Sequence, residues 1–455
     1  MGFRFDRRDF LKAGAASAGL LAVPGWLNAF AAPDPTTGGR KPNIILILSD
    51  DHSIPGVSCY GGEFQTPQLD AMAKKGVRFE YCFSEPLCAP SRAMLMTGRF
   101  PFRTGVISNN AVKLSPETET VIPKLLKQVG YSTGLAGKWS QLPHIDTAEE
   151  AAKWGFDEFM IWDPKGERYW NPSLNKNGQQ VPVTDKSFGP DLLNDFVVDF
   201  ASRHKDSPFF IYYPMTLIHS QLFQTPDHNE GDKKKNLLAE NILYMDKLVG
   251  KLLSELERMK MDENTLIMFT GDNGQGLDAK VDGKMICGNK GSMLEGGSRV
   301  PLIASWKGTV PAGTVVKDMV EFSDFYATIA ELAGAKMPEN LTFDSRSFAQ
   351  QLKGKAGDPR NWVFIQLQDE WYVRSRGWKL NQKGELFDMK EAPFKEIPVE
   401  ADSKDPGAVA ARKELQAVLD DLKPAGRKGG DRAGNEDEGK GGGKKREKKA
   451  EKKKQ

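Results

Sequence analysis

Short apolar runs alternate along this chain with longer segments in which apolar residues recur every three or four positions. The runs at 43–48, 208–213 and 265–270 are mostly apolar and rich in β-branched and aromatic residues, as in strands buried on both faces of a sheet. The segments at 191–203 and 236–258 have the spacing of amphipathic helices. This alternation predicts an α/β body, with a large mixed, mostly parallel sheet flanked by helices.

The pattern changes after residue 355. Several short segments there have the alternation of antiparallel strands and are followed by a helical pattern over 408–422. These segments are 362–366, 371–375, 378–380 and 385–388. We therefore predict a main domain over 41–355 and a smaller α+β subdomain with an antiparallel sheet over 356–423.

The last stretch, 424–455, consists mostly of Gly, Lys and Glu and has no aromatic residue, so it is predicted to be disordered because it cannot bury a core. Its 12 Lys and Arg against 6 Asp and Glu give it a net charge of +6; the whole chain carries +2, so the rest carries −4. Because the excess positive charge lies in the tail, it gives no information about the substrate of the folded part, and we expect no nucleic-acid partner. The tail is either solvated or contacts an anionic polymer or a membrane surface.

The N-terminus has the composition of an export signal. A charged start at 7–12 precedes a short apolar run over 13–23, and Ala29 and Ala31 frame a cleavage point after Ala31. The run is too short to cross a bilayer, so 1–31 is predicted to be a signal peptide and the protein to have no stable membrane anchor. The R-R-x-F-L-K sequence resembles a twin-arginine signal, which implies the twin-arginine export machinery as a partner; an ordinary secretory signal with a chance arginine pair is the alternative. Either way, the mature protein is expected to be periplasmic or secreted by a bacterium.

The chain has four cysteines, Cys59, Cys82, Cys88 and Cys287. Their spacing contains no CxxC pair and no cysteine–histidine pattern of a zinc site. Four cysteines in a chain of this length do not make a disulfide framework, but a single disulfide is left open.

Polar residues follow two of the predicted buried strands. Asp50 and Asp51 come soon after one strand, and Asp272 and Asn273 come soon after another. Sheets of this class bind ligands at the carboxyl ends of their strands, and a hard divalent cation binds several oxygen atoms at one point. The two pairs therefore predict a divalent cation site, although each pair alone also fits a solvated turn.

A long pattern, C-x-P-S-R-x-x-x-x-T-G-R, runs from Cys88 to Arg99. Taken alone, a cysteine next to a proline fits a small buried residue at the start of a helix. The whole pattern resembles the signature of the formylglycine-dependent sulfatases, which belong to the alkaline phosphatase-like superfamily. A second pattern, K-x-x-x-x-E-G-G-x-R-V-P over 290–301, is similar to another segment of that family, and the matches follow the family's order from about residue 41 to 422.

The resemblance implies a modified residue and a metal ion. Cys88 is expected to be oxidised after synthesis to Cα-formylglycine, an aldehyde, by a formylglycine-generating maturation enzyme. The resemblance also implies that one calcium ion (Ca2+) is bound by residue 88 together with Asp50, Asp51, Asp272 and Asn273. The resemblance therefore implies that the main domain, 41–355, is a sulfatase catalytic domain.

The resemblance further implies catalytic side chains around Cys88. Arg92, Lys138 and Lys290 are expected to offset negative charge on the sulfuryl oxygens and on the hydrated aldehyde. His219 is expected to protonate the leaving alcohol as a general acid. The E-G-G-x-R-V-P portion is expected to be mainly architectural.

Two positions depart from the family's pattern. The family commonly has G-K-W-H where this chain has G-K-W followed by Ser140, so a serine replaces a histidine that hydrogen-bonds the hydrate. Ser140 still donates one hydrogen bond but cannot carry a proton charge, and His144 is a candidate substitute. The family also has His-x-Pro where this chain has His219-Ser220-Gln221. The serine at position 140 bears on the deprotonation step more than on the binding of a sulfate.

Together, the matches predict a sulfuric ester hydrolase that cleaves a sulfate monoester of a small molecule or, by preference, of a glycan. The alternatives are a phosphonate or phosphodiester hydrolase on the same scaffold and a catalytically weakened relative that binds sulfated glycans. Specificity is expected in two loops without a motif, at 139–163 and 167–189. In them, Trp162, Tyr169 and Trp170 are candidates for stacking on sugar faces or for ordinary packing.

Overall fold

The computed structural model describes residues 40–139, 142–143, 145–229 and 236–426. The predicted signal peptide at 1–31, Ser140, His144 and the tail beyond residue 426 lie outside the described residues.

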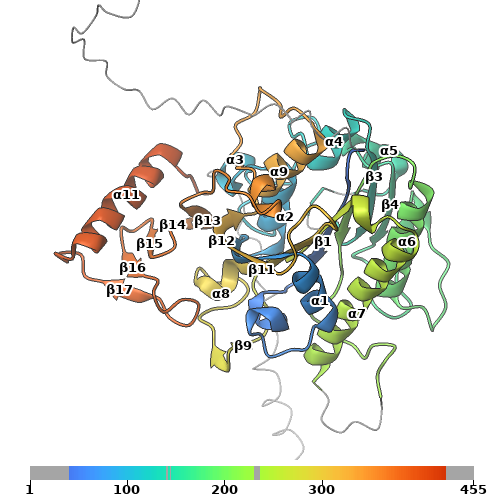
Figure 1. Cartoon of the computed structure of the whole chain (residues 1–455), viewed down its shortest axis with the longest axis horizontal. Helices are drawn as coiled ribbons and strands as arrows, with labels where there is room; N and C mark the ends of the chain where they lie inside the picture. Colours follow the sequence, from blue (N-terminus) through green and yellow to red (C-terminus); the bar gives the residue numbers. More distant parts are fainter. Residues whose placement is uncertain (1–39, 140–141, 144, 230–235, 427–455) are drawn as a thin grey trace, which may run out of the picture. The chain divides into compact units, whose positions relative to one another are not determined.

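A ten-stranded sheet runs through the main body in the order β12-β2-β11-β8-β1-β7-β3-β4-β5-β6 (Figure 1). The central strands from β8 to β4 are parallel to one another, whereas β11 is antiparallel to both of its neighbours and β5 and β6 form an antiparallel edge. The predicted mixed, mostly parallel sheet is therefore confirmed. The strands are β1 (Asn43–Ser49), β2 (Val77–Phe83), β3 (Ser132–Gly137), β4 (Glu158–Trp162), β5 (Leu174–Lys176), β6 (Gln179–Gln180), β7 (Phe209–Pro214), β8 (Thr265–Gly271), β11 (Arg299–Ser305) and β12 (Thr314–Glu321).

Successive side chains of β1 lie in two separate hydrophobic cores. Ile44, Leu46 and Leu48 belong to one core, while Ile45 and Ile47 belong to the other. Alternate residues of a strand face opposite sides of the sheet, so both faces of β1 are buried. This explains why its sequence is a continuous apolar run and not an alternation of apolar and polar residues.

Helices cover both faces of the sheet (Figure 1). The helices α1, α6 and α7 contribute side chains to the core that contains Ile45, and α2, α4 and α9 contribute to the core that contains Ile44. Helix α7 begins where the sequence predicts, because the side chain of Asn236 accepts hydrogen bonds from the first free backbone N–H groups. The bounds are α1 (Pro67–Lys75), α2 (Cys88–Thr97), α4 (Ile122–Lys127), α6 (Gly189–Arg203), α7 (Leu237–Arg258) and α9 (Asp324–Ala333).

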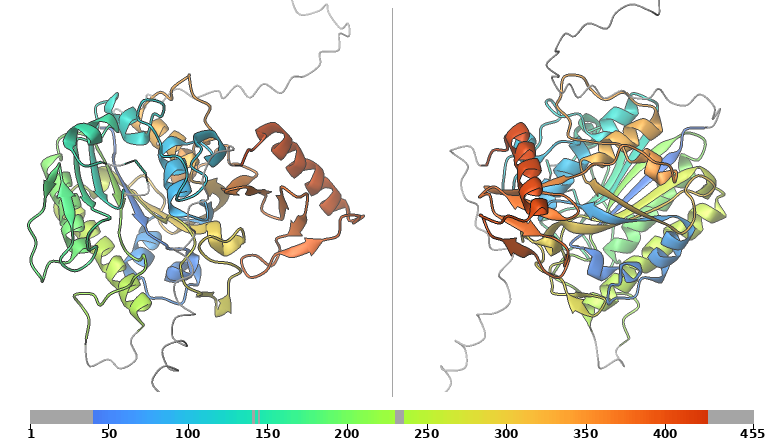
Figure 2. Two further views of the ribbon diagram at one scale, coloured as in Figure 1. Left: turned by 180° about the vertical axis from the view of Figure 1, so that it is seen from behind. Right: turned by 60° about the vertical axis from the view of Figure 1, so that its left-hand side comes forward.

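A second, five-stranded antiparallel sheet forms from the C-terminal part of the chain, with α11 packed against it (Figure 2). Its first four strands agree with the segments predicted from the sequence. The fifth, β17, was not predicted, because it has only three residues and one of them is a proline. The elements are β13 (Val363–Leu367), β14 (Glu370–Arg374), β15 (Trp378–Asn381), β16 (Leu386–Asp388), β17 (Ile397–Val399) and α11 (Pro406–Leu422).

Buried polar contacts join the small sheet to the main body. Arg374 in β14 forms two hydrogen bonds of 3.0 Å with Glu295 in the short helix α8 (Glu295–Ser298), and both side chains are 1% exposed. The backbone N–H of Gln366 in β13 donates to the Glu85 carboxylate at 2.7 Å. Glu295 belongs to the E-G-G-x-R-V-P pattern, so this contact agrees with an architectural role for that segment.

The segment 139–163, predicted to be a loop, contains α5 (Ala148–Lys153) and β4. Thr147 and Glu150 form a reciprocal capping box at the start of the helix. The apolar residues of β4 pair with β3 and extend the sheet. The loop prediction was wrong here because both elements are short and their apolar patterns span only a few residues. The second predicted loop, 167–189, likewise contains β5 and β6.

All four cysteines are free. Among the helices of the described residues, none combines the length and the apolar composition that a membrane span requires.

Candidate active site

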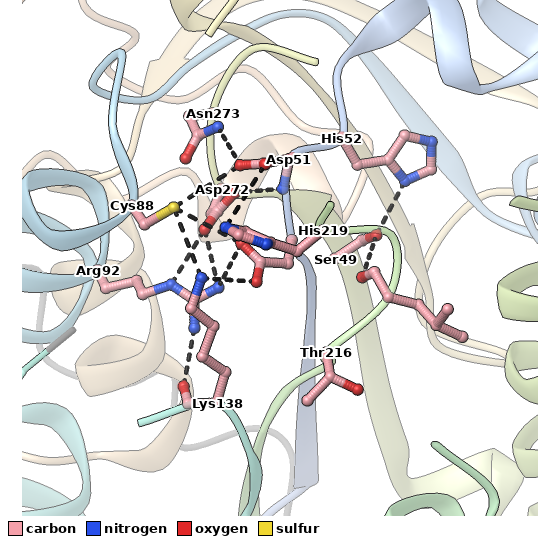
Figure 3. A network of polar contacts seen from close by, with 12 residues as sticks. Ser49, Asp51, His52, Cys88, Arg92, Lys138, Thr216, His219, Asp272 and Asn273 are labelled. Carbon is pink, nitrogen blue, oxygen red and sulfur yellow. Dashed lines mark hydrogen bonds and ion pairs between the residues drawn. The ribbon is translucent and has the colours of Figure 1, made fainter. Parts of the chain in front are cut away.

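The carboxyl ends of β1 and β8 bring together the two polar pairs predicted from the sequence. Ser49 and Gly271 are register partners in these parallel strands, so the residues that follow them lie side by side. The backbone turns at Asp51, whose φ of 56° is in the left-handed region, and its N–H donates to Asp272 Oδ1 at 2.9 Å. Cys88, the first residue of α2, lies against this turn (Figure 3).

The side chains of Asp50, Asp51, Cys88 and Asp272 form a buried cluster. One ligand atom from each, Cys88 Sγ or a carboxylate oxygen, lies within 4.8 Å of all the others. Cys88 Sγ is 3.6 Å from Asp50 Oδ1 and 3.7 Å from Asp51 Oδ1. Carboxylates packed this closely repel one another, so the arrangement requires positive charge.

Asn273 supplies the observation that points most directly to a cation. Its amide nitrogen donates to Asp51 Oδ1 and to the backbone of Gly274, both at 2.9 Å, but its buried Oδ1 has no hydrogen-bond partner among the described residues. A buried carbonyl oxygen without a donor is costly. Next to the carboxylates it completes the oxygen-rich ligand set that a hard divalent cation prefers. The residues present therefore fit the expected calcium ion.

Arg92 lies one helical turn after Cys88 and faces the carboxylates. Its Nε and Nη2 donate to Asp272 Oδ2 at 3.0 and 2.8 Å, and Nη2 is 3.4 Å from Asp50 Oδ1. Burial lowers the pKa of Arg92, but Asp272 and Asp50 outweigh this and raise the pKa above its usual range. Because Nη1 also donates to the backbone of Lys138 at 2.8 Å, the guanidinium is engaged on every side by the chain itself. Arg92 therefore holds two of the expected cation ligands, and its role in offsetting charge on the sulfuryl oxygens and on the hydrate stays a prediction.

Two lysines occupy the other sides of the cluster. Lys138, which follows β3, lies with Nζ 2.7 Å from Asp50 Oδ2 and 3.8 Å from Cys88 Sγ. Lys290 Nζ is 3.0 Å from the Asp51 carboxylate. The Lys138 side chain is 1% exposed, whereas that of Lys290 is 19% exposed. The open side of the site is therefore near Lys290.

His219 lies in the segment after β7, on the open side. Its Nε2 is 3.5 Å from Lys290 Nζ and 3.8 Å from Asp51 Oδ2, and its side chain is 15% exposed. Burial lowers the pKa of His219 below its ordinary value, and the Lys138 and Lys290 cations add to this against the opposing effect of Asp50. An anion placed between His219 and Lys290 would act in the opposite direction and favour the protonated imidazole.

Burial and the charges of the cluster also shift the pKa of the Cys88 thiol. Burial and the neighbouring Asp272 raise the pKa of Cys88 well above its ordinary value. The unmodified side chain is therefore a neutral thiol near neutral pH, which is a poor nucleophile. Burial also raises the pKa of Asp272 to about 6, while Lys138 and its neighbours overcome burial and hold the pKa of Asp50 well below its usual range.

The charges of the cluster are balanced without any added ion. Three carboxylates face three cationic side chains, so a bound divalent cation gives the site an excess positive charge of about two units. Such an excess favours an anionic ligand at the open side. The six residues are Asp50, Asp51, Asp272, Arg92, Lys138 and Lys290.

The structure brings together all the described residues that were predicted to be catalytic or to bind the metal, whereas Ser140 and His144 lie outside the described residues. Tyr169, one of the aromatic residues considered for stacking on sugars, is not available for it. Its side chain is 1% exposed, and its hydroxyl donates to the backbone carbonyls of Thr216 and His219. That option for Tyr169 was wrong. Sequence reasoning also missed Arg168, whose guanidinium lies 4.8 Å from the Trp162 ring centroid. The consecutive Arg-Tyr-Trp run was the available signal, but its hydrogen-bond partners His219, Ser220 and Gln224 lie 50 to 54 positions away.

Comparisons with known proteins agree with this geometry. A model of the family described as Sulfatase matches residues 42–335. N-acetylgalactosamine-6-sulfatase of Canis lupus familiaris is 31% identical, covering 74% of this chain and 72% of the relative, and arylsulfatase D of Homo sapiens is 28% identical, covering 70% of each. The crystal structure of Ps i-CgsB in complex with k-i-k-neocarrahexaose is 27% identical, has a TM-score of 0.73, and covers 84% of this chain and 93% of that chain.

Proposed function

This chain belongs to the sulfatase family, and we propose that it hydrolyses the sulfate monoester of a sulfated carbohydrate, using formylglycine made from Cys88 and one calcium ion. The observation that carries the proposal is the position of Cys88 Sγ, between the oxygen-rich cage and Lys138. Sulfatase activity is a property of the family, whereas the modified residue, the metal and the sugar are the proposal.

Cys88 and the cation act as a unit in this proposal. Asp50, Asp51, Asp272 and the free Oδ1 of Asn273 hold the cation. As the hydrated aldehyde, residue 88 would supply a hydroxyl nucleophile, and a cation bound by these residues would lower the proton affinity of that hydroxyl. The chain supports this in two ways: the unmodified thiol is neutral and so unsuited to attack, and Arg92 keeps Asp272 and Asp50 in place.

The lysines account for the negative charge of the substrate. A sulfate monoester carries one negative charge, and more charge develops on its oxygens as the sulfur–oxygen bond to the alcohol breaks. Lys290 and Lys138, on two sides of Cys88, are positioned to interact with these oxygens. Because both lysines also contact carboxylates, a bound cation that engages Asp50 and Asp51 leaves the ammonium groups available to the substrate.

His219 is the proposed general acid that protonates the leaving alcohol. In the net reaction, water adds to sulfur, the ester bond breaks, and the alcohol oxygen leaves with a proton. His219 Nε2 lies on the open side next to Lys290, where the alcohol portion must project. An anionic substrate raises the pKa of His219 from its lowered value, so binding itself favours the protonated imidazole that the step requires.

The sugar and the location are proposed from the relatives and from the N-terminal sequence. One relative acts on N-acetylgalactosamine 6-sulfate according to its name, and one structural neighbour was solved with a neocarrahexaose. Carbohydrate recognition is proposed here from those likenesses. The export-type N-terminus supports a periplasmic or secreted enzyme, with the twin-arginine machinery and a formylglycine-generating enzyme as its partners in maturation.

Turnover by a Cys88→Ala variant tests the function. The protein is produced in a host that modifies a control sulfatase and is assayed on an aryl sulfate and on an aryl phosphodiester. We expect a preference for the sulfate and a loss of at least about a thousandfold in kcat with Cys88→Ala. Retained wild-type turnover in Cys88→Ala would contradict the mechanism. A preference for the phosphodiester would identify a phosphodiesterase, and binding of sulfated glycan without turnover by the wild type would identify a binding protein.

A further inference from the structure

Three consecutive side chains, those of Arg168, Tyr169 and Trp170, donate hydrogen bonds to backbone carbonyls of the segment that carries His219. The Tyr169 hydroxyl lies 2.8 Å from the carbonyl oxygen of His219 and 3.1 Å from that of Thr216. Arg168 Nη2 donates to the carbonyl of Ser220 at 3.1 Å, and Trp170 Nε1 donates to that of Gln224 at 2.8 Å. We call these three residues the 168–170 clamp.

The segment held by the clamp, residues 216–224, contains no helix or strand. Its first part is tied to the end of β1, since the N–H of Asp50 donates to Leu217 at 2.8 Å and the N–H of Ile218 donates to Asp50 at 2.9 Å. The second part begins at His219. The clamp donates hydrogen bonds to the carbonyls of this second part, and the Tyr169 hydroxyl also donates to the carbonyl of Thr216 in the first part.

The clamp itself is fixed in place by packing. The Tyr169 ring stacks on Phe188, with ring centroids 6.0 Å apart, and the N–H of Gly189 donates to the Tyr169 carbonyl. The Arg168 guanidinium lies over the rings of Trp162 and Tyr169, 4.8 and 5.4 Å from their centroids. A rigid support of this kind can transmit its position to the segment that it holds.

We propose that Tyr169 is the positioning residue for the general acid: through its hydroxyl it sets where His219 Nε2 lies relative to the leaving-group oxygen. The inference rests on the proposed role of His219. A catalytic acid must lie within hydrogen-bond reach of the atom that it protonates, and an error of about 1 Å lowers the rate by roughly a hundredfold. Among the described residues, the hydroxyl hydrogen-bonds to the carbonyls of His219 and Thr216 and to no metal ligand, so we expect its removal to affect proton transfer more than cation binding.

Tyr169→Phe removes the hydroxyl and keeps the ring that packs on Phe188. Its matched control is Tyr131→Phe. Tyr131 is also 1% exposed, and its hydroxyl donates to the backbone of Pro42 at 2.8 Å. These two residues precede β3 and β1, so the control bond lies at the amino edge of the sheet, one strand length of about 20 Å from the site.

The experiment measures kcat/KM on phenyl sulfate and on 4-nitrophenyl sulfate, for the wild type, both phenylalanine variants and His219→Ala. Phenolate is the poorer leaving group and depends more on protonation. We expect Tyr169→Phe to lower kcat/KM on phenyl sulfate about 10- to 100-fold, and on 4-nitrophenyl sulfate about threefold or less. His219→Ala should show the same bias more strongly, and Tyr131→Phe should show none.

The outcomes separate the two proposals. If His219→Ala lowers both rates equally, or leaves them unchanged, the general-acid role fails whatever Tyr169 does. If His219→Ala shows the bias and Tyr169→Phe behaves like Tyr131→Phe, the positioning role of Tyr169 is wrong. An equal loss on both substrates by Tyr169→Phe, or a change in its calcium affinity beyond about threefold, would overturn it as well, because the hydroxyl would then support the whole site.

A second measurement does not depend on turnover. Crystal structures of Tyr169→Phe and Tyr131→Phe should show His219 displaced or in more than one conformation only in the former, with Asp50 and Asp51 unmoved in both. An unshifted His219 in Tyr169→Phe would contradict the inference even if the catalytic rates changed.

Discussion

Replacing Glu295 by glutamine removes the negative charge from a buried ionic contact between the main body and the small sheet. Glu295 accepts two hydrogen bonds of 3.0 Å from Arg374 and one of 3.3 Å from Arg299. The side chains of Glu295 and Arg374 are both 1% exposed, and that of Arg299 is 9% exposed. Glutamine has nearly the same shape, so the change isolates the charge and one acceptor atom.

The expected loss of stability follows from these contacts. A hydrogen bond to a charged group contributes about 1.5–3 kcal/mol, and Glu295→Gln weakens two such bonds to Arg374. It also leaves a buried guanidinium without a carboxylate, and breaking a buried pair by removing one partner costs about 3–5 kcal/mol in all. We therefore expect the free energy of unfolding to fall by about 3–5 kcal/mol.

Urea unfolding measures this change, and a double-mutant cycle assigns it. Glu295→Leu and Arg374→Met should each cost a similar amount alone, while the two combined should recover at least about 2 kcal/mol of the summed losses. A loss below about 1 kcal/mol for Glu295→Gln, or additive losses in the double variant, would refute the reasoning. The contact would then be no more important than a surface ion pair.

Two further predictions concern the metal and a buried histidine. Calcium at a hundredfold excess over its Kd should raise the free energy of unfolding by about 2.7 kcal/mol, and Asp272→Asn should remove most of this gain. Thermal unfolding with and without a chelator measures both effects. A midpoint that is the same with and without the chelator would contradict the cation site. Burial lowers the pKa of His52 from 6.5 to about 4. The unfolded chain therefore binds a proton in this window that the folded chain does not, and stability, intact above pH 6.5, should fall by up to about 3 kcal/mol as the pH drops from 6.5 to 4. His52→Gln should flatten the dependence of the urea midpoint on pH, and a slope equal to that of the wild type would rule out His52 as its source.

The parts of the fold that could be predicted are those that a local pattern encodes. β1, β7 and β8 are buried on both faces, so their sequences are nearly continuous apolar runs. β12, in contrast, lies at the edge of the sheet and its first half alternates between half-buried and exposed residues. Its sequence, TVVKDMVE, gives a weaker signal, and no strand was predicted there.

The site could be predicted as a set of residues but not as a geometry. Asp50 and Asp272 follow neighbouring parallel strands, so their convergence follows from the strand pattern. Nothing in the sequence told whether the Arg92 side chain faces the substrate or the carboxylates. Tyr169 was misjudged for a similar reason: its partner His219 is 50 residues away, and only the folded chain brings the hydroxyl to that carbonyl.

The mass of the peptide that contains Cys88 tests the central claim most directly. The protein is produced in a host that modifies a control sulfatase, digested, and analysed by mass spectrometry. Conversion of the cysteine side chain to an aldehyde lowers the mass by about 18 Da, because sulfur and hydrogen leave as oxygen enters. We predict the lighter peptide. An unmodified Cys88, alongside a modified control, would contradict the account, since the buried neutral thiol is not by itself a competent nucleophile.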